Sequence, residues 1–145
     1  MLRRWSGSHW PADDFTVADN RQDLAWHQQE HEAGIAFTYT MLDPAQSECL
    51  GCVYIKENNV PELAGGDHEA IVRFWVRQTH LAGALDRRLL AALVAWFQEA
   101  WAFSRVYFHT NEQDHHQVQL LNASTLPYRL TATIPDRSGR YRFYG

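Results

Sequence analysis

The sequence of 145 residues lacks two features that define large classes of proteins. It has no basic excess, because 13 Lys and Arg residues stand against 17 Asp and Glu residues and give a net charge of −4. Without a positive field the chain has no general attraction for nucleic acid or anionic lipid, so neither is expected as a partner. It also has no apolar run of the roughly 18 residues that a membrane helix needs, and its first ten residues lack the apolar stretch of a signal peptide. We therefore expect a cytoplasmic protein.

Cysteine is scarce, since Cys49 and Cys52 are the only two and form a single CxxC. No second CxxC or CxxH lies at the spacing of a zinc site. The pair falls in a strand-like run, where residues three apart point to opposite faces of a sheet. We expect two ordinary thiols rather than a redox pair or half of a metal site.

The eight histidines contain one pair at metal-binding spacing, His27 and His31, which are four residues apart in a predicted helix. The pair lacks the Glu of a zinc-hydrolase motif and is surrounded by Gln and Glu, so we expect a polar surface stripe and no metal. The sequence also has no serine-nucleophile elbow, Walker loop or dinucleotide fingerprint. Hydrolase, kinase and dehydrogenase functions are not supported.

With 46% hydrophobic residues, the sequence has enough apolar side chains for the core of one domain over residues 1–145. Thr16 and Asp19 fit a capping box that opens a surface helix with one narrow buried stripe. Val72 and Phe74 lie on the predicted core face of one strand. The expected elements are helix 17–31, strands 37–41, 52–55 and 70–77, helix 86–101, strand 106–108, helix 114–123 and strands 128–134 and 141–144. A strand–helix–strand unit between hairpins predicts an α+β (mixed α/β) domain with a mixed, mostly antiparallel sheet flanked by helices.

Five short segments of this pattern have a family-like sequence: FTYT at 37–40, LGCVYI at 50–55, FWVR at 74–77, LDRRLL at 85–90 and FHTN at 108–111. In order and sequence they resemble the GCN5-related N-acetyltransferase superfamily, and within it a little-characterised bacterial acetyltransferase-like group. The resemblance implies the acyl-CoA N-acyltransferase fold. It also implies direct transfer of acetyl from acetyl-CoA to the amine of a small molecule or peptide.

The resemblance further assigns residues to the coenzyme. Backbone groups of one strand would hold the pantetheine arm, the next turn would hold the pyrophosphate, and an Asn would lie beside the arm. The residues at these positions are Phe74, Val76, Gly83, Ala84, Leu85, Asp86 and Asn111.

The pyrophosphate turn departs from the family pattern, (Gln/Arg)-x-x-Gly-x-(Gly/Ala), which falls here on LAGALD at 81–86. Ala84 and Asp86 replace the two small residues that let backbone amides approach phosphate. Asp86 either places a carboxylate near the phosphate or acts as an N-cap or first-turn acid of its own helix. Arg87 and Arg88 either supply positive charge to the turn or are simply solvated, and Asn111 either binds the arm or caps the following helix.

Acetyl transfer needs a group that accepts a proton from the amine. Glu69 is our candidate for that catalytic base, and the alternative is an exposed acid before a strand. Where the family often has a Tyr as general acid, this sequence has Leu121.

The N-terminal part, 1–36, is atypical, because only 36 residues precede Phe37 and they contain one convincing helix and no clear first strand. In the superfamily this part helps to form the acceptor wall, so a shortened version would leave an apolar patch for a second chain to cover. This gap, with Trp5 and Trp10 near the N-terminus, predicts a homodimer. The degenerate turn, Leu121 and the short N-terminal part also favour an alternative, a catalytically inactive, dimeric binding or interaction module with the same fold.

Overall fold

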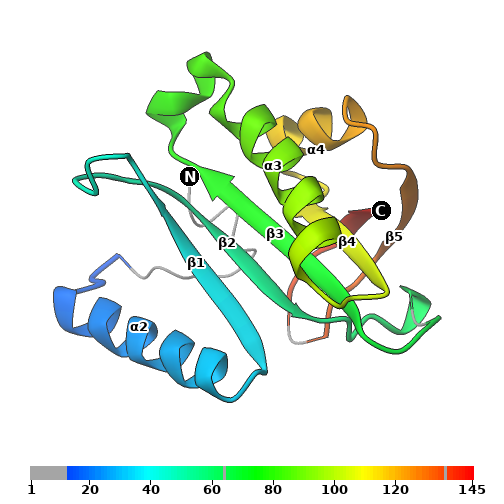
Figure 1. Cartoon of the computed structure of the whole chain (residues 1–145), viewed down its shortest axis with the longest axis horizontal. Coiled ribbons are helices and arrows are strands. Elements are labelled where there is room, and N and C mark those ends of the chain that lie inside the picture. The colour runs from blue at the N-terminus through cyan, green and yellow to red at the C-terminus, as the bar shows by residue number, and fades with distance from the viewer. Residues whose placement is uncertain (1–12, 64, 136) are drawn as a thin grey trace.

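The computed structural model describes residues 13–63, 65–135 and 137–145. The expected helices and strands are confirmed to within a few residues, and two short 3-10 helices, η1 and η2, were not predicted. The elements are α2 (Val17–Glu32), β1 (Ala36–Leu42), β2 (Cys49–Glu57), η1 (Pro61–Leu63), β3 (Glu69–Val76), η2 (Gln78–Gly83), α3 (Leu85–Ala100), β4 (Arg105–Asn111), α4 (His115–Asn122), β5 (Tyr128–Ala132) and β6 (Tyr141–Tyr144) (Figure 1). No helix in the described part of the chain is long and apolar enough to span a membrane.

The strands form one six-stranded sheet in the order β1-β2-β3-β4-β6-β5. Only β3 and β4 pair in parallel, because α3 carries the chain back across the sheet between them. The remaining neighbours pair antiparallel. The predicted mixed, mostly antiparallel sheet is therefore confirmed.

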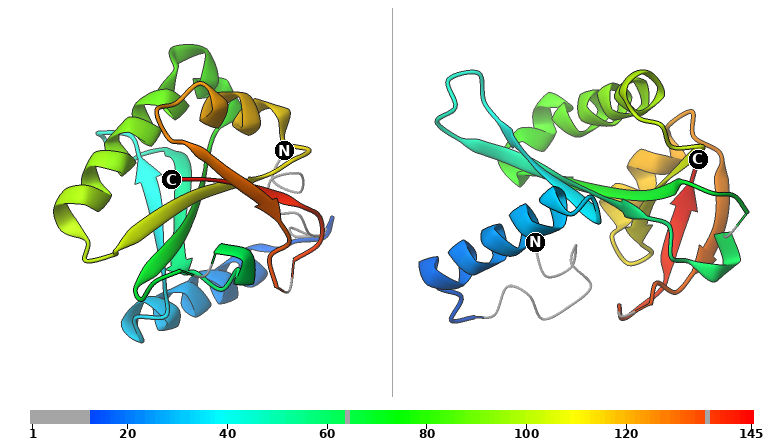
Figure 2. Two further views of the ribbon diagram at one scale, coloured as in Figure 1. Left: turned by 90° about the vertical axis from the view of Figure 1, so that its right-hand side faces the viewer. Right: turned by 60° about the horizontal axis from the view of Figure 1, so that its bottom comes forward.

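Helices cover both faces of this sheet: α3 and α4 lie on one side and α2 lies on the other, beside β1 (Figure 2). The core under α3 and α4 contains the predicted face of β3, with Val72 and Phe74. A second cluster, which was not predicted, lies on the opposite face beside β5 and β6 and includes Ile71, Tyr107 and Phe143. Both faces of β3 are thus buried over part of its length.

Helix α2 begins at the predicted capping box, in which the Asp19 amide donates to Thr16 Oγ1 and the Thr16 amide donates to Asp19 Oδ2. The predicted narrow buried stripe is wrong, because no residue of α2 is buried. Leu24 and Trp26 remain 53% and 61% exposed. Contacts with β1, rather than burial in the core, therefore hold α2 against the sheet. Trp5 and Trp10, used above to predict a dimer, lie outside the described residues.

Candidate active site

Strands β3 and β4 separate part of the way along their length. Their parallel pairing runs from Glu69 opposite Arg105 to Val72 opposite Phe108 and stops there. Strand β3 continues to Val76 and β4 continues to Asn111. We call the opening between residues 73–76 of β3 and 109–111 of β4 the strand split.

The backbone of Phe74 and Val76 faces the strand split. On the other side of β3, the Arg77 amide donates to the Leu50 carbonyl at 2.8 Å. In an antiparallel ladder, alternate residues bond to the partner strand and the residues between them point away. Phe74 and Val76 are such intermediate residues, so their N–H and C=O groups point away from β2 and toward β4.

Gln117 of α4 occupies part of this opening. Its side-chain nitrogen Nε2 donates to the Phe74 carbonyl at 3.0 Å, and the residue is 8% exposed. Its other polar atom, Oε1, is buried and has no hydrogen-bond partner among the described residues. Gln117 was not selected from the sequence, because nothing in the sequence of a short helix predicts a hydrogen bond to a strand residue 43 positions earlier.

The turn expected to hold pyrophosphate lies between β3 and α3. It consists of the end of η2, then Ala84 with φ +54°, then the first residues of α3. A positive φ favours glycine, the residue that the family pattern has at this position, and Ala84 adopts it despite its methyl group. A Cβ atom added to Gly83 would meet nothing within 4 Å. The amides of Leu85 and Asp86 have no acceptor among the described residues, since first-turn amides lack a partner inside their helix.

Asp86 lies in the first turn of α3 and is 5% exposed. Its Oδ2 is 2.7 Å from Nε2 of His116 in α4, and its Oδ1 accepts from the Arg87 amide at 2.8 Å. The interpretation of Asp86 as a first-turn acid is confirmed, whereas the N-cap interpretation is wrong, because Ala84 is the N-cap residue and makes no side-chain cap bond. Arg87 and Arg88, which follow it, are exposed.

Asn111 is the last residue of β4, and its Oδ1 accepts from the Gln113 amide at 2.9 Å. The N-cap of α4 is Asp114, whose side chain accepts from the Gln117 amide. The capping interpretation of Asn111 is therefore wrong, and the residue forms an Asx turn that leads into the helix. Its role beside a coenzyme arm stays a prediction.

Glu69 lies at the opposite end of β3 from the strand split. It is 5% exposed, and its carboxylate accepts from Asn58 Nδ2 at 3.0 Å. The expectation of an exposed acid is thus wrong. Phe74 is five positions along β3 from Glu69, which is about 16 Å of extended strand. The structure therefore does not bring Glu69 to the strand split. Leu121 packs in the core beneath α4.

A row of polar side chains crosses the α2 side of the sheet at the level where β3 and β4 separate. Thr38 pairs with Tyr54, Tyr54 pairs with Arg73, and His109 is the first residue of β4 beyond the last rung. Paired residues point to the same face, and alternation places Arg73 and His109 on the face opposite Val72 and Phe108. We call Thr38, Tyr54, Arg73 and His109 the polar row. None of them was chosen as a site residue from the sequence.

The Arg73 guanidinium in this row lies over the Tyr54 ring, with 5.3 Å from Cζ to the ring centroid. Burial, and then the nearby cation of Arg137, lower the pKa of Arg73 to about 9, so the side chain is cationic at neutral pH. Burial also raises the pKa of the Tyr54 phenol to about 12. The row therefore places a positive charge beside the strand split.

His109 is 6% exposed and contacts the rings of Tyr141 and Phe143, with centroids 5.7 and 5.5 Å away. Its Nδ1 has no hydrogen-bond partner among the described residues. Burial, followed by the charges of Arg73, Arg137 and Lys56, holds the pKa of His109 well below 6.5. The imidazole is therefore neutral at pH 7.

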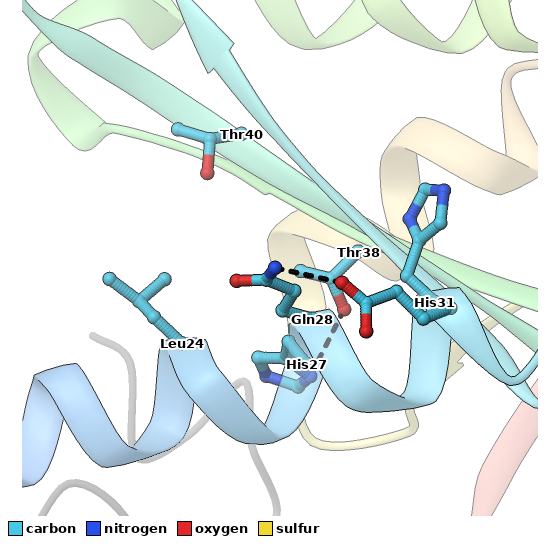
Figure 3. A pocket seen from close by; sticks show the side chains of 7 residues that line it. Leu24, His27, Gln28, His31, Thr38 and Thr40 are labelled. Carbon is cyan, nitrogen blue, oxygen red and sulfur yellow. Dashed lines mark hydrogen bonds between the residues drawn. The ribbon is translucent and has the colours of Figure 1, made fainter.

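Next to the polar row, α2 and β1 enclose an open pocket of about 350 Å³, shown in Figure 3. In it, His27 Nδ1 lies 3.2 Å from Thr38 Oγ1 and also 3.2 Å from Glu30 Oε2. In Figure 3 the His31 ring points away from the His27 ring, and it contacts the ring of Phe37. The two histidines thus do not converge on one point. In residues 13–63, 65–135 and 137–145, no three His, Cys, Asp or Glu side chains form a group able to hold a metal.

The two cysteines are closer to one another than the sequence predicts. The β1–β2 register shifts after Met41, so that Leu42 pairs with Cys49 and Leu50 is an extra residue. The expected separation onto opposite faces is therefore wrong, and the two thiols interact electrostatically. Burial, and then the neighbouring Cys49, raise the pKa of Cys52 to about 11, which is opposite to the shift of a catalytic redox thiol.

Comparison of the whole fold with solved structures finds acetyltransferases. A ribosomal-protein-S5-alanine acetyltransferase from Vibrio fischeri superposes with a TM-score of 0.72 at 17% identity and covers 99% of this chain and 78% of its own. RimL, a ribosomal L7/L12 alpha-N-protein acetyltransferase solved with coenzyme A, gives 0.73 at 12% identity with the same coverage. Spermidine N-acetyltransferase SpeG from Vibrio cholerae gives 0.64 at 13% identity and covers 87% of this chain and 74% of its own.

Sequence comparisons give no such matches: no protein-family model and no curated protein sequence matches the chain. At 12 to 17% identity, the structural likeness establishes the fold and leaves the chemistry to be argued from the residues.

Proposed function

We propose that this chain, which has the fold of the GCN5-related N-acetyltransferases, transfers an acetyl group from acetyl-CoA to the amine of a small molecule or peptide. One observation carries the proposal. The backbone groups of Phe74 and Val76 face a strand split, and from β3 the chain runs through η2 to a left-handed residue at Ala84 and the N-terminus of α3. Such an arrangement offers amides and carbonyls to a long polar arm and positive helix-end dipoles to its phosphates.

The residues of the turn fit a pyrophosphate group. The amides of Leu85 and Asp86 have no acceptor in the described part of the chain, and Gly83 leaves open space beside them. The Asp86 carboxylate, whose charge is adverse to phosphate, is engaged by His116 and the Arg87 amide. The exposed side chain of Arg87 adds positive charge at the same helix end.

The strand split fits the remainder of the coenzyme in part. Gln117 already donates a hydrogen bond to the Phe74 carbonyl. In our proposal the backbone of Val76 therefore binds the pantetheine arm. When bound, acetyl-CoA supplies a thioester that a neutral amine can attack directly. The amine would approach from the α2 side, because α3 and α4 cover the other face.

On that side, His109 is the titratable group that β4 places at the start of the strand split. Its imidazole is unprotonated at pH 7, which a proton acceptor requires, although the burial that lowers its pKa also makes it a weaker base. Glu69, the sequence-based candidate, is four strand residues, about 13 Å, away from that point. We propose that His109 accepts the proton of the attacking amine.

The alternative proposal, a dimeric binding module without catalysis, also has specific support. Gln117 fills one backbone position of the strand split, and the contact between Asp86 and His116 joins α3 to α4 beside the turn. Both contacts would reduce affinity for a coenzyme. The homodimer stays a prediction under either proposal.

Isothermal titration with acetyl-CoA and with coenzyme A tests the first proposal against the alternative. We expect micromolar binding to the unmodified protein, unchanged binding to Gly83→Ala and at least tenfold weaker binding to Gly83→Glu. The alanine variant is the matched control, because its methyl group enters open space, whereas glutamate adds a charge that repels phosphate. Absence of heat at hundreds of micromolar ligand would exclude the acetyltransferase and favour the binding module.

A further inference from the structure

The side chains of Asp86 and His116 form a pair at the turn proposed to hold pyrophosphate. Asp86 is buried and His116 is exposed, and Asp86 Oδ2 lies 2.7 Å from His116 Nε2. The other carboxylate oxygen, Oδ1, accepts from the Arg87 amide in the same first turn of α3. The charge of the pair therefore lies beside the amides of Leu85 and Asp86, which have no acceptor among the described residues.

The contact between the two side chains is compatible with both protonation states of His116. A neutral imidazole has one N–H, and a carboxylate beside Nε2 favours the tautomer in which Nε2 carries that proton and donates it to Asp86 Oδ2. A second proton adds to Nδ1 and leaves this hydrogen bond in place. The pair therefore has one negative charge when His116 is neutral and no net charge when His116 is protonated.

His116 is the titratable side chain that contacts the Asp86 carboxylate. The other charged or titratable side chains on the adjoining parts of α3, η2, the β4–α4 loop and α4 are Arg87, Arg88, His80, Glu112, Asp114 and His115. Among the described residues, none of them forms an ion pair with Asp86 or His116. His80 and Glu112 pair with residues elsewhere, and Asp114 accepts from an amide of its own helix.

We infer that His116 controls the affinity of the turn for the coenzyme through Asp86, because a proton taken up by His116 cancels the carboxylate charge next to the pyrophosphate. This inference rests on the proposed binding of acetyl-CoA at the turn. Histidine ordinarily changes its charge between about pH 5 and pH 8. Coenzyme affinity therefore rises as the pH falls through this range, since the pair repels a phosphate anion only while His116 is neutral.

The inference explains how the turn can hold a phosphate although it departs from the family pattern. That pattern has Gly or Ala at the position of Asp86, so its turn carries no side-chain charge there. This chain has a carboxylate at the position and, 30 residues later, a histidine that contacts it. The two side chains together, rather than Asp86 alone, determine the charge that a phosphate meets.

The same relation couples coenzyme binding to proton binding. If protonation of His116 raises the affinity for the coenzyme, bound coenzyme raises the affinity of His116 for its proton by the same factor. Binding near neutral pH is then accompanied by uptake of part of a proton from the buffer. A contact between Asp86 and His116 that served stability alone would produce no such uptake.

Isothermal titration of the protein with 3′-dephospho-coenzyme A at pH 6 and pH 8 tests the inference. The pyrophosphate of this ligand keeps its charge between the two pH values, whereas a phosphate monoester, such as the 3′-phosphate of coenzyme A, titrates there. We expect the Kd to be at least threefold lower at pH 6 than at pH 8. Titration at pH 7 in two buffers of different ionisation enthalpy is expected to show proton uptake.

Two variants fix the charge of the pair. His116→Gln can still donate to Asp86 but cannot be protonated, so we expect the affinity of the unmodified protein at pH 8 to be found at both pH values, without proton uptake. His116→Arg is permanently cationic, so we expect the higher affinity at both pH values. His115→Gln changes an exposed neighbour on the same helix and is the matched control, which keeps the original pH dependence.

The outcomes separate this inference from the proposed function. A Kd of the unmodified protein that does not change with pH would overturn the inference, and so would an equal ratio of the two Kd values in His116→Gln and in the unmodified protein. Both results leave the proposed function intact, because the coenzyme still binds. Absence of binding at both pH values would overturn the proposed function, and the inference with it.

Discussion

His116 Nε2 lies 2.7 Å from Asp86 Oδ2 and so joins α4 to the first turn of α3 across 30 residues of sequence. The Asp86 side chain is 7% exposed and the His116 side chain 52% exposed, so the contact has a buried acidic end and a solvent-facing basic end. Together with the bond from Gln117 to Phe74, it places α4 against both the turn and the strand split. The properties of Asp86 and Gln117 therefore bear on both stability and coenzyme affinity.

Replacement Asp86→Asn is expected to strengthen coenzyme A binding about tenfold, because it removes a negative charge from the turn while keeping a side chain able to bond to His116. It is also expected to lower the free energy of unfolding by about 1–2 kcal/mol through loss of a charge-assisted hydrogen bond. Titration calorimetry and urea unfolding measure the two effects. Glu99→Gln, at the exposed other end of α3, is the control for charge alone. Weaker binding by Asp86→Asn would contradict the idea that this acid opposes phosphate.

Replacement Gln117→Ala is expected to lower the free energy of unfolding by about 1–3 kcal/mol, because it leaves the buried Phe74 carbonyl without its donor. Urea unfolding of Gln119→Ala, an exposed glutamine of the same helix, measures the background cost of the change. Equal losses in the two variants would show that the bond across the strand split contributes nothing to stability.

His109 is expected to make the protein less stable in mild acid. Its pKa in the folded state lies well below 6.5, whereas in the unfolded state it lies near that value. Below about pH 6.5 the unfolded chain therefore binds a proton that the folded chain does not, and stability falls with pH by up to about 1.4 kcal/mol per pH unit from this group.

Urea unfolding between pH 7.5 and 5 measures this effect. The slope is expected to be shallower in His109→Gln than in the unmodified protein, while His115→Gln, an exposed histidine, keeps the original slope. Identical slopes for the protein and His109→Gln would mean that the imidazole is not held neutral by burial.

Cys52 is expected to react slowly with iodoacetamide at pH 8. A pKa of about 11 rather than 9 reduces the reactive thiolate on the order of a hundredfold. Mass spectrometry of peptides from the unmodified protein reports the labelling rate of Cys52 itself, against a small thiol of ordinary pKa; Cys49 is kept, because it is one cause of the raised pKa. Labelling as fast as that of the small thiol would contradict the raised pKa.

Sedimentation is expected to show a homodimer at micromolar concentration, twice the 16.8 kDa of one chain. On α2, Leu24 and Trp26 are exposed, and β1 is an edge strand of the sheet. Trp26→Arg is therefore expected to weaken association, with Gln22→Arg as a control on the same helix. A pure monomer at micromolar concentration would count against the dimer.

The elements of the fold were predictable because their signals are local. Apolar residues spaced three and four apart predict α3, and the Thr16–Asp19 capping box marks the start of α2. The strand split follows less directly, since its residues 74 and 76 were identified through a family resemblance rather than through periodicity. The β1–β2 bulge at Leu50 was missed, because an extra residue in a strand leaves no mark in the pattern of alternation.

The site was less predictable, because its contacts join distant residues. Gln117 meets Phe74 across 43 residues and His116 meets Asp86 across 30, and both contacts depend on how α4 packs. His109 looked like an ordinary strand residue until the register placed it beyond the last β3–β4 rung. Glu69, in contrast, was chosen as an acid near a strand end that the resemblance places on the acceptor side, but β3 begins at Glu69, at the end away from the strand split.

The position of β6 constrains the order in which the sheet forms. Although it is the last strand in sequence, β6 lies between β4 and β5, and β5 pairs with no other strand of the described sheet. Strand β5 thus has no backbone partner until β6 has been synthesised and has paired with β4. We therefore expect β5 to become ordered late, only once β6 has paired with β4, with the exposed edge of β4 as the surface most open to misassembly before then.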